Sequence, residues 1–186
     1  MNYQNLIHQY TKILEEFFTV KESLFEEFLN LTAESLKAGH KILVFGNGGS
    51  AAQAQHFAAE LVNKFLKIRL PLKAISLTTD TSALTSISND SSFEYVFSRQ
   101  IEALGEKGDV AVALSTSGDS SNVIRAIEVA KRKELLTAGF TGKGGGQLSQ
   151  LVDYLLDVPS ESTPRIQEAH LLLLHLLAQE LEERLG

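Results

Sequence analysis

The sequence of 186 residues contains no cysteine and no long uninterrupted hydrophobic segment. The first absence excludes disulfide bonds, thiolate catalysis and zinc sites with cysteine ligands, and it agrees with a reducing compartment. The longest apolar stretch, 171–178, is interrupted by His175 and is far shorter than the ~20 residues of a membrane span. The first residues include acidic side chains and no cleavable apolar core, so we expect no signal peptide and a cytoplasmic location.

Runs of basic residues are also missing. Lys+Arg 17 against Asp+Glu 23 leaves a formal net charge of −6. Because nucleic acids and anionic membrane surfaces are bound by clustered basic residues, we expect no nucleic-acid partner and no membrane partner. The hydrophobic share of 44% and the charged share of 22% are those of an ordinary globular protein, and the length suits one domain.

Hydrophobic periodicity predicts alternating helices and strands. A helical period covers roughly the first 38 residues, and Gly39 lies where a helix C-cap glycine belongs. Short apolar runs predict five strands, at 41–45, 74–77, 109–114, 136–140 and 154–158. Helices are expected between them at 51–65 and from Ser120 to Lys133, and after them at 164–185, with Pro164 in the first turn.

This alternation indicates an α/β fold with a parallel sheet flanked by helices on both faces. The continuous apolar strands agree with it, since parallel strands are buried on both sides. We predict a single domain over 1–186, with 1–39 as an N-terminal helical extension.

Two loops of small residues, GNGGS and STSGDS, each follow a predicted strand and precede a predicted helix. Ligands of open α/β sheets bind at the carboxyl ends of the strands, where both loops lie. In the first loop, Gly48 and Gly49 permit close approach or positive φ, and Ser50 can cap the helix that follows. In the second, four hydroxyls suit a phosphate group, namely Ser115, Thr116, Ser117 and Ser120.

A single loop of this kind could be an ordinary capping turn, but two at comparable places in one sheet predict a site for a phosphorylated small molecule. Neither loop contains the Gly-Lys-Ser/Thr of a Walker loop or the third glycine of a dinucleotide fingerprint. ATP hydrolysis and hydride transfer are therefore disfavoured.

Candidate acid–base and metal-binding residues lie on two helices. His56 and Glu60 are four residues apart and share a helix face. The last helix carries Gln167 and His175 within a segment that is apolar all round, so we expect His175 to be shielded from bulk water. The alternatives remain open, because a histidine in an apolar helix is often a core residue and a His/Glu pair is often a surface pair.

The spacing of Gln167 and His175 limits a shared metal site. Eight residues span ~12 Å along a straight helix. Ligand atoms around one zinc ion lie ~3–4 Å apart. These two side chains therefore lean toward each other, serve different sites, or form a set that is completed across a subunit interface.

The sequence resembles the phosphoheptose isomerases of the sugar isomerase (SIS) domain superfamily over nearly its whole length. The resemblance rests on five segments in the expected order, GNGGSAAQAQHFAAEL, ISND, LSTSGDSSNV, FTGKGGG and RIQEAHLLLLH. It implies a flavodoxin-like three-layer sandwich and interconversion of sedoheptulose 7-phosphate and glycero-manno-heptose 7-phosphate. That step would feed ADP-heptose synthesis for lipopolysaccharide or a related surface glycan.

The resemblance also implies a homotetramer with active sites at subunit interfaces and a divalent ion, usually zinc. The implied metal ligands are His56, Glu60, Gln167 and His175. The implied substrate contacts are Asn47, Gly48, Gly49, Ser50, Glu60, Asn89, Asp90, Ser115, Thr116, Ser117, Ser120 and Gln167. Lys64 stands where some relatives have an arginine, and an ammonium lacks the planar fork of a guanidinium. This departure leaves the details of substrate contact open but not the chemistry.

For the reaction we assign Glu60 as base and His175 as acid, with an enediol intermediate. The roles of base and metal ligand compete at Glu60, because a coordinated carboxylate is less basic. Two alternatives stand beside this hypothesis, a non-enzymatic tetramer that binds the replication initiator protein and a SIS isomerase for another phosphosugar. The presence of both Glu60 and His175 favours the enzyme.

Overall fold

The computed structural model describes residues 2–186 and has a five-stranded, fully parallel sheet at its centre. The strands lie in the order β2-β1-β3-β4-β5. Their bounds are β1 (Ile42–Gly46), β2 (Ala74–Ser76), β3 (Val110–Ser115), β4 (Leu136–Thr141) and β5 (Tyr154–Asp157). All five strands predicted from apolar runs are confirmed, with ends that differ by one residue at most.

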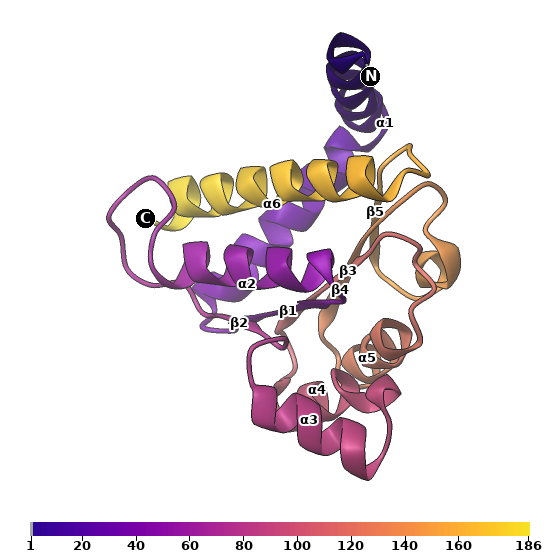
Figure 1. Ribbon diagram of the computed structural model, residues 1–186. Helices are drawn as coiled ribbons and strands as arrows, with labels where there is room; N and C mark the ends of the chain where they lie inside the picture. The colour runs from indigo at the N-terminus through magenta and orange to yellow at the C-terminus, as the bar shows by residue number, and fades with distance from the viewer. Residues whose placement is uncertain (1) are drawn as a thin grey trace.

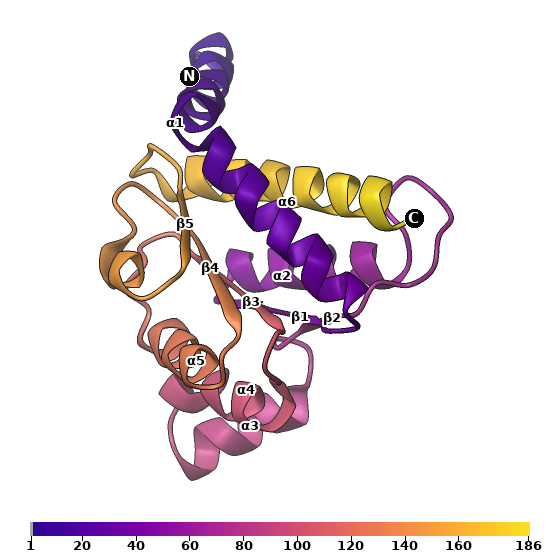
Figure 2. The same ribbon diagram turned by 180° about the vertical axis from the view of Figure 1, so that it is seen from behind.

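Helices cover both faces of the sheet, which gives three layers (Figures 1 and 2). One face carries α1 (Tyr3–Lys37), α2 (Gly49–Val62) and α6 (Thr163–Leu185). The other carries α3 (Thr81–Asp90), α4 (Ser98–Leu104) and α5 (Ser121–Arg132), together with two short 3-10 helices, η1 (Phe93–Tyr95) and η2 (Gly146–Gln150). The predicted α/β fold is confirmed. None of the described helices is both long enough and apolar enough to cross a membrane.

The sheet separates two hydrophobic clusters, and β1 shows why its sequence is apolar throughout. Its residues alternate between the faces, so that Ile42 and Val44 join the cluster under α1, α2 and α6. Leu43 and Phe45 join the cluster under α4 and α5, where the Phe45 ring lies 5.4 Å from that of Phe97. A strand buried on both sides has no polar face to alternate with.

Helix α1 is one continuous helix of 35 residues, which confirms the helical period of the N-terminal segment. It ends at Lys37, and Gly39 follows with a φ of +91°, as expected of a glycine just beyond a helix. Phe17 and Phe28 anchor α1 in the core. Its first turns extend beyond the rest of the molecule, and Tyr3 is exposed there (Figure 1).

The strand order creates a crevice between β1 and β3. From β1 the chain passes to α2 on one face of the sheet, whereas from β3 it passes to α5 on the opposite face. The loops after these two neighbouring strands diverge, and a ligand can enter between them. Both loops that the sequence singled out lie at this point.

Candidate active site

The first loop, which joins β1 to α2, leaves the start of α2 without a side-chain cap. Gly48 is the N-cap residue with a φ of 55°, and no side chain accepts a hydrogen bond from the first turn. The prediction that Ser50 caps α2 is wrong. The helix already begins at Gly49, so Ser50 lies inside the first turn and is buried, whereas a capping side chain must precede that turn.

The second loop, between β3 and α5, gathers its hydroxyls around Gly118. Ser115 Oγ accepts a hydrogen bond from the Gly118 N–H at 3.1 Å and lies 3.4 Å from Ser120 Oγ. Ser117 Oγ accepts from the Asp119 N–H at 3.2 Å. Helix α5 has no side-chain cap, so its first N–H groups and these hydroxyls form a cradle of donors suited to a phosphate.

The glycine-rich segment after β4 closes over this second loop. Gly118 has a φ of +74°, and a Cβ atom there would lie 1.9 Å from the carbonyl oxygen of Gly145. A cavity of about 250 Å³ lies beside the loop and the start of α6, and its lining includes Thr116, Ser117 and Lys143. Lys143 lines this cavity together with Glu161, whose carboxylate lies 3.9 Å from its ammonium group, and the sequence patterns indicated neither residue.

The two loops are joined by a pair of asparagine side chains. Asn47 and Asn122 exchange two amide hydrogen bonds, each with a nitrogen–oxygen distance of 2.9 Å. Asn47 follows β1, whereas the buried Asn122 lies in the first turn of α5. The pair bridges the crevice and holds the β1 loop against the phosphate cradle. Sequence analysis identified Asn47 but missed Asn122, although it lies in the SSNV segment that follows the second loop.

Helices α2 and α6 lie side by side and run in the same direction (Figure 1). At their starts, Gln53 Nε2 donates to the Gln167 carbonyl oxygen at 2.6 Å. His56, about one turn after Gln53 on α2, faces His175, about two turns after Gln167 on α6. Of the three alternatives for Gln167 and His175, the structure does not show the two side chains leaning toward each other, because the Gln167 amide lies against Gly49.

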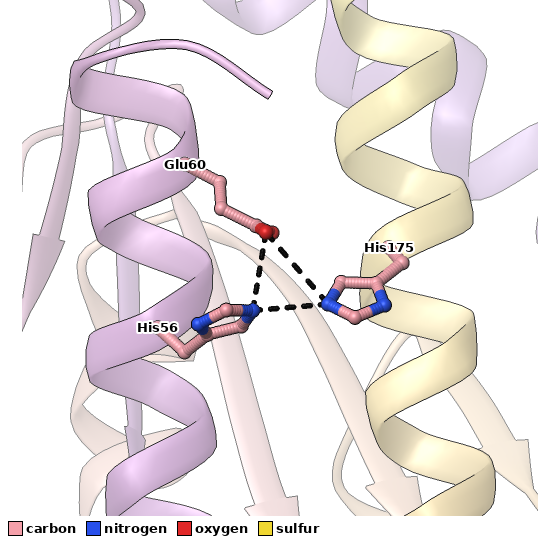
Figure 3. Close-up of side chains that lie close together, drawn as sticks. All are labelled: His56, Glu60 and His175. Atoms are coloured by element: carbon pink, nitrogen blue, oxygen red, sulfur yellow. Dashed lines mark hydrogen bonds and ion pairs between the residues drawn. The ribbon is translucent and has the colours of Figure 1, made fainter. Parts of the chain in front are cut away.

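His56, Glu60 and His175 point toward one another across the space between α2 and α6 (Figure 3). The two Nε2 atoms are 2.9 Å apart, and Glu60 Oε1 lies 3.1 Å from His56 Nε2 and 3.7 Å from His175 Nε2. Glu60 Oε2 is buried and has no hydrogen-bond partner among the described residues. The prediction of a shared His56–Glu60 helix face is confirmed, and His175 completes the group.

The spacing of these three atoms fits a divalent metal ion. Donor atoms at ~2.0–2.2 Å from a tetrahedral zinc ion are separated by roughly 3.3 Å, close to the distances in this group. Two imidazole nitrogens and one carboxylate oxygen are also the donor types that zinc takes. The unpaired Oε2 of Glu60 is a further sign that the group binds a partner from outside the protein chain, because buried polar atoms are rarely left unpaired.

His175 is less shielded than the sequence suggested. Its side chain is 33% exposed, and those of His56 and Glu60 are 50% and 15% exposed. The apolar helix instead buries His170, whose Nε2 lies 3.0 Å from the carbonyl oxygen of Thr141. Burial lowers the pKa of His170 to about 4, against the effect of that hydrogen bond. His170 is the core histidine, whereas His175 opens to the site.

The remaining predicted contacts, Asn89 and Asp90, lie apart from this group at the end of α3. Both residues are exposed, and the Asn89 amide donates to the Asp90 carboxylate at 2.8 Å. Within residues 2–186 no hydrogen bond joins either of them to the two loops.

Phe65 also lies at the group of His56, Glu60 and His175, because its ring is 5.6 Å from that of His175.

Comparison with known proteins shows to which family this fold and site belong. The SIS domain family profile matches residues 5–142. The phosphoheptose isomerase of Desulfovibrio desulfuricans is 54% identical over 168 residues, which cover 90% of this chain and 80% of that protein. The phosphoheptose isomerase of Aliarcobacter butzleri is 50% identical over 183 residues, which cover 97% and 95%. The structure of the Neisseria gonorrhoeae phosphoheptose isomerase superposes with a TM-score of 0.91 at 40% identity and covers 97% of both chains.

Proposed function

The chain belongs to the phosphoheptose isomerases of the SIS domain family, and from this premise we propose how its site performs the reaction. The protein is an aldose–ketose isomerase that interconverts sedoheptulose 7-phosphate and glycero-manno-heptose 7-phosphate. The alternative of a non-enzymatic partner of the replication initiator is set aside.

The substrate phosphate is bound in the cradle of the second loop. Ser115, Ser117 and Ser120 supply hydroxyls, and the start of α5 supplies free N–H groups. The first loop, held by the Asn47–Asn122 pair, faces the sugar hydroxyls from the other side of the crevice. With the phosphate and the hydroxyls bound in this way, the carbonyl end of the sugar lies at the group of His56, Glu60 and His175 between α2 and α6.

The proton transfer between C1 and C2 is carried out by Glu60, and His175 exchanges a proton with the sugar oxygens. Isomerisation through an enediol needs one base and one acid that reach adjacent atoms of the substrate. The observation that carries this assignment is the convergence of both side chains from separate helices, with Glu60 Oε2 buried and unpaired.

The group of His56, Glu60 and His175 would also hold a divalent ion, which would make Glu60 a weaker base than the free carboxylate, and the resemblance adds Gln167 as a fourth ligand. Such an ion, when bound, polarises a carbonyl group and stabilises negative charge on oxygen. The amide of Gln167 lies beside Gly49, so its participation requires a different side-chain conformation. We propose zinc because the donors are two imidazoles and a carboxylate.

A homotetramer with active sites at subunit contacts is proposed from the exposed apolar side chains. Ile68 and Leu70 are 93% and 82% exposed in the loop after α2, the helix that carries His56 and Glu60. Tyr3 and Ile7 are exposed on the projecting part of α1. Apolar surface of this kind marks protein contacts. Analytical ultracentrifugation should give four times the 20.4 kDa of one chain; a monomer would contradict the proposal.

We further propose that the enzyme acts in the cytoplasm and supplies heptose for lipopolysaccharide or a related surface glycan. Deletion of its gene should remove heptose from the surface glycan of the host. Expression of the wild-type chain should restore it, whereas expression of Glu60→Gln should not. Unchanged glycan composition in the deletion strain would refute the placement.

The catalytic assignment is tested with purified protein and sedoheptulose 7-phosphate, followed by NMR with added zinc and after chelation. We expect formation of the aldoheptose 7-phosphate by the wild type and its loss on chelation. Glu60→Gln should bind substrate and lose turnover, while Glu128→Gln, an exposed change on α5, should match the wild type. Near-wild-type turnover by Glu60→Gln would refute the role of Glu60, and full activity after verified metal removal would refute the metal.

A further inference from the structure

The carboxyl end of α2 is held by a buried ion pair that lies just beyond the reacting group. Arg69 Nη2 donates to the Glu60 carbonyl oxygen at 2.9 Å, and Nη1 donates to that of Leu61 at 2.8 Å. The last carbonyls of a helix have no partner within the helix, and a cation is favourable at that end. Arg69 therefore caps the turn that carries Glu60.

The partner of Arg69 is Glu182 on α6. Arg69 Nε lies 3.2 Å from Glu182 Oε2, in an ion pair without hydrogen-bond alignment, and the two side chains are 0% and 2% exposed. The Glu182 carboxylate also accepts from three consecutive backbone N–H groups, at 2.9 Å from Phe65, 2.7 Å from Leu66 and 2.6 Å from Lys67. Burial alone would raise the pKa of Glu182, but these donors and Arg69 outweigh it and lower the pKa.

The same helix thus carries one reacting side chain and this anchor. Glu182 follows His175 by seven residues, or two turns, and so lies on the same face of α6. On α2, Glu60 lies two residues before the helix ends at Val62. Phe65, whose N–H is bound by Glu182, packs its ring against His175.

We infer that Glu182 and Arg69 are positioning residues that set the register of α2 against α6 and so hold Glu60 opposite His175. The distances that this register controls are those from His175 Nε2 on α6 to the two α2 side chains, 2.9 Å to His56 Nε2 and 3.7 Å to Glu60 Oε1. A sub-ångström slip of α2 along α6 changes both of these distances at once. The inference rests on the proposed roles of Glu60 and His175.

The test compares Glu182→Gln with Glu183→Gln. Both changes remove a carboxylate from the same turn of α6, and both residues contact the loop after α2, Glu183 through an ion pair with Lys67. Glu183 is 46% exposed, however, and it accepts from no backbone N–H group of that loop in the part of the chain that the structure describes. Only the change at Glu182 removes the anchor.

For Glu182→Gln we expect kcat to fall about 10- to 100-fold, as is usual when a group that orients reacting or metal-binding side chains is removed. KM for sedoheptulose 7-phosphate should stay within about 2-fold, since the phosphate cradle lies on other elements. Affinity for zinc, measured by competition with a chromophoric chelator, should fall by a similar factor of about 10 to 100. Glu183→Gln should leave all three quantities unchanged.

Arg69→Lys provides a second variant in case Glu182→Gln does not fold, because a lysine cannot bridge two carbonyls and a carboxylate. It should show the same fall in kcat with unchanged KM, and the double variant should lose little more than either single one. Circular dichroism at the assay temperature confirms folding. Folded variants with wild-type kcat and zinc affinity, or a rise in KM that matches the fall in kcat, would overturn the inference.

Failure of the proposed function gives a different result. If Glu60 and His175 are not the reacting pair, Glu60→Gln itself retains turnover. If the function holds and only the positioning role is wrong, Glu60→Gln is inactive while Glu182→Gln keeps its kcat.

Discussion

The bridge between Asn47 and Asn122 makes a quantitative prediction about substrate affinity. Replacing Asn122 with alanine removes two side-chain hydrogen bonds of 2.9 Å, one of them donated by the buried Asn122. A typical hydrogen bond contributes ~0.5–1.5 kcal/mol net, so the two together contribute about 1–3 kcal/mol to holding the first loop against the second. If the substrate binds only when the two loops are held together, the variant binds substrate more weakly by this amount of free energy.

One factor of ten in affinity corresponds to ~1.4 kcal/mol, so Asn122→Ala should raise KM for sedoheptulose 7-phosphate by roughly 5- to 150-fold. The inhibition constant of inorganic phosphate should rise much less, because the cradle around Ser115 and Ser120 does not depend on the first loop. The turnover number should change little, since Glu60 and His175 project from α2 and α6.

The assay is steady-state kinetics at 25 °C, with phosphate as a competitive inhibitor, for the wild type, Asn122→Ala and Asn30→Ala. Asn30→Ala is the control, because its amide also binds a side chain, that of Arg184, but lies on α1 away from the crevice. An unchanged KM for Asn122→Ala, with normal folding, would refute the view that the amide pair holds the binding crevice together.

Three further predictions concern the core, the metal and the response to acid. Phe28→Ala removes a fully buried ring beside Phe140 and should lower the free energy of unfolding by about 3–5 kcal/mol in urea titrations; a loss below 1 kcal/mol would contradict its place in the core. His56→Ala should lower zinc affinity at least tenfold in calorimetric titration while His40→Ala leaves it unchanged, and equal affinities would refute the ligand assignment. Because the pKa of His170 is depressed from 6.5 to about 4, the unfolded state binds its proton first. Neutral His170 makes its full contribution to the free energy of unfolding above pH 6.5. That free energy should fall by about 3 kcal/mol as the pH falls to 4. His170→Gln, which keeps a donor for Thr141, should flatten the stability curve over that range, and an unchanged slope would contradict the buried neutral state.

Local pattern was sufficient for the strands and for most helices of the α2–α6 face. Val110–Ser115 and its neighbours are continuous apolar runs that a sheet buried on both sides requires. The region of α3 and α4 was not predicted as helical. Helix α3 has the sequence TSALTSISND, in which serine, threonine, asparagine and aspartate, all weaker helix formers, outnumber the apolar residues. Only Leu84 and Ile87 pack against the core, and both are partly buried, so the apolar stripe is short. Its start is fixed by Asp80, whose side chain accepts from the Ala83 N–H.

Sequence patterns single out individual candidate residues of the site but not their arrangement. The four-residue spacing of His56 and Glu60 is a local signal and proved correct. The approach of His175, the pairing of Asn47 with Asn122, and the contact of Arg69 with Glu182 join residues far apart in the sequence. Such contacts follow from strand order and helix packing, which a single pattern does not encode. Ser50 shows the opposite error, in which a local capping signal was overruled by the glycines before it.

The separation of His56 and His175 by 119 residues has a consequence for the order of folding. Helix α6 follows all five strands along the chain, so α2 has no opposite wall until the sheet is complete and α6 has docked on it. Contacts between distant segments form late, because loop-closure entropy must first be overcome. Intermediates with a finished sheet and an undocked α6 would bind phosphate in the cradle yet leave the sugar chemically untouched. Return of activity in refolding experiments should therefore lag behind return of the sheet.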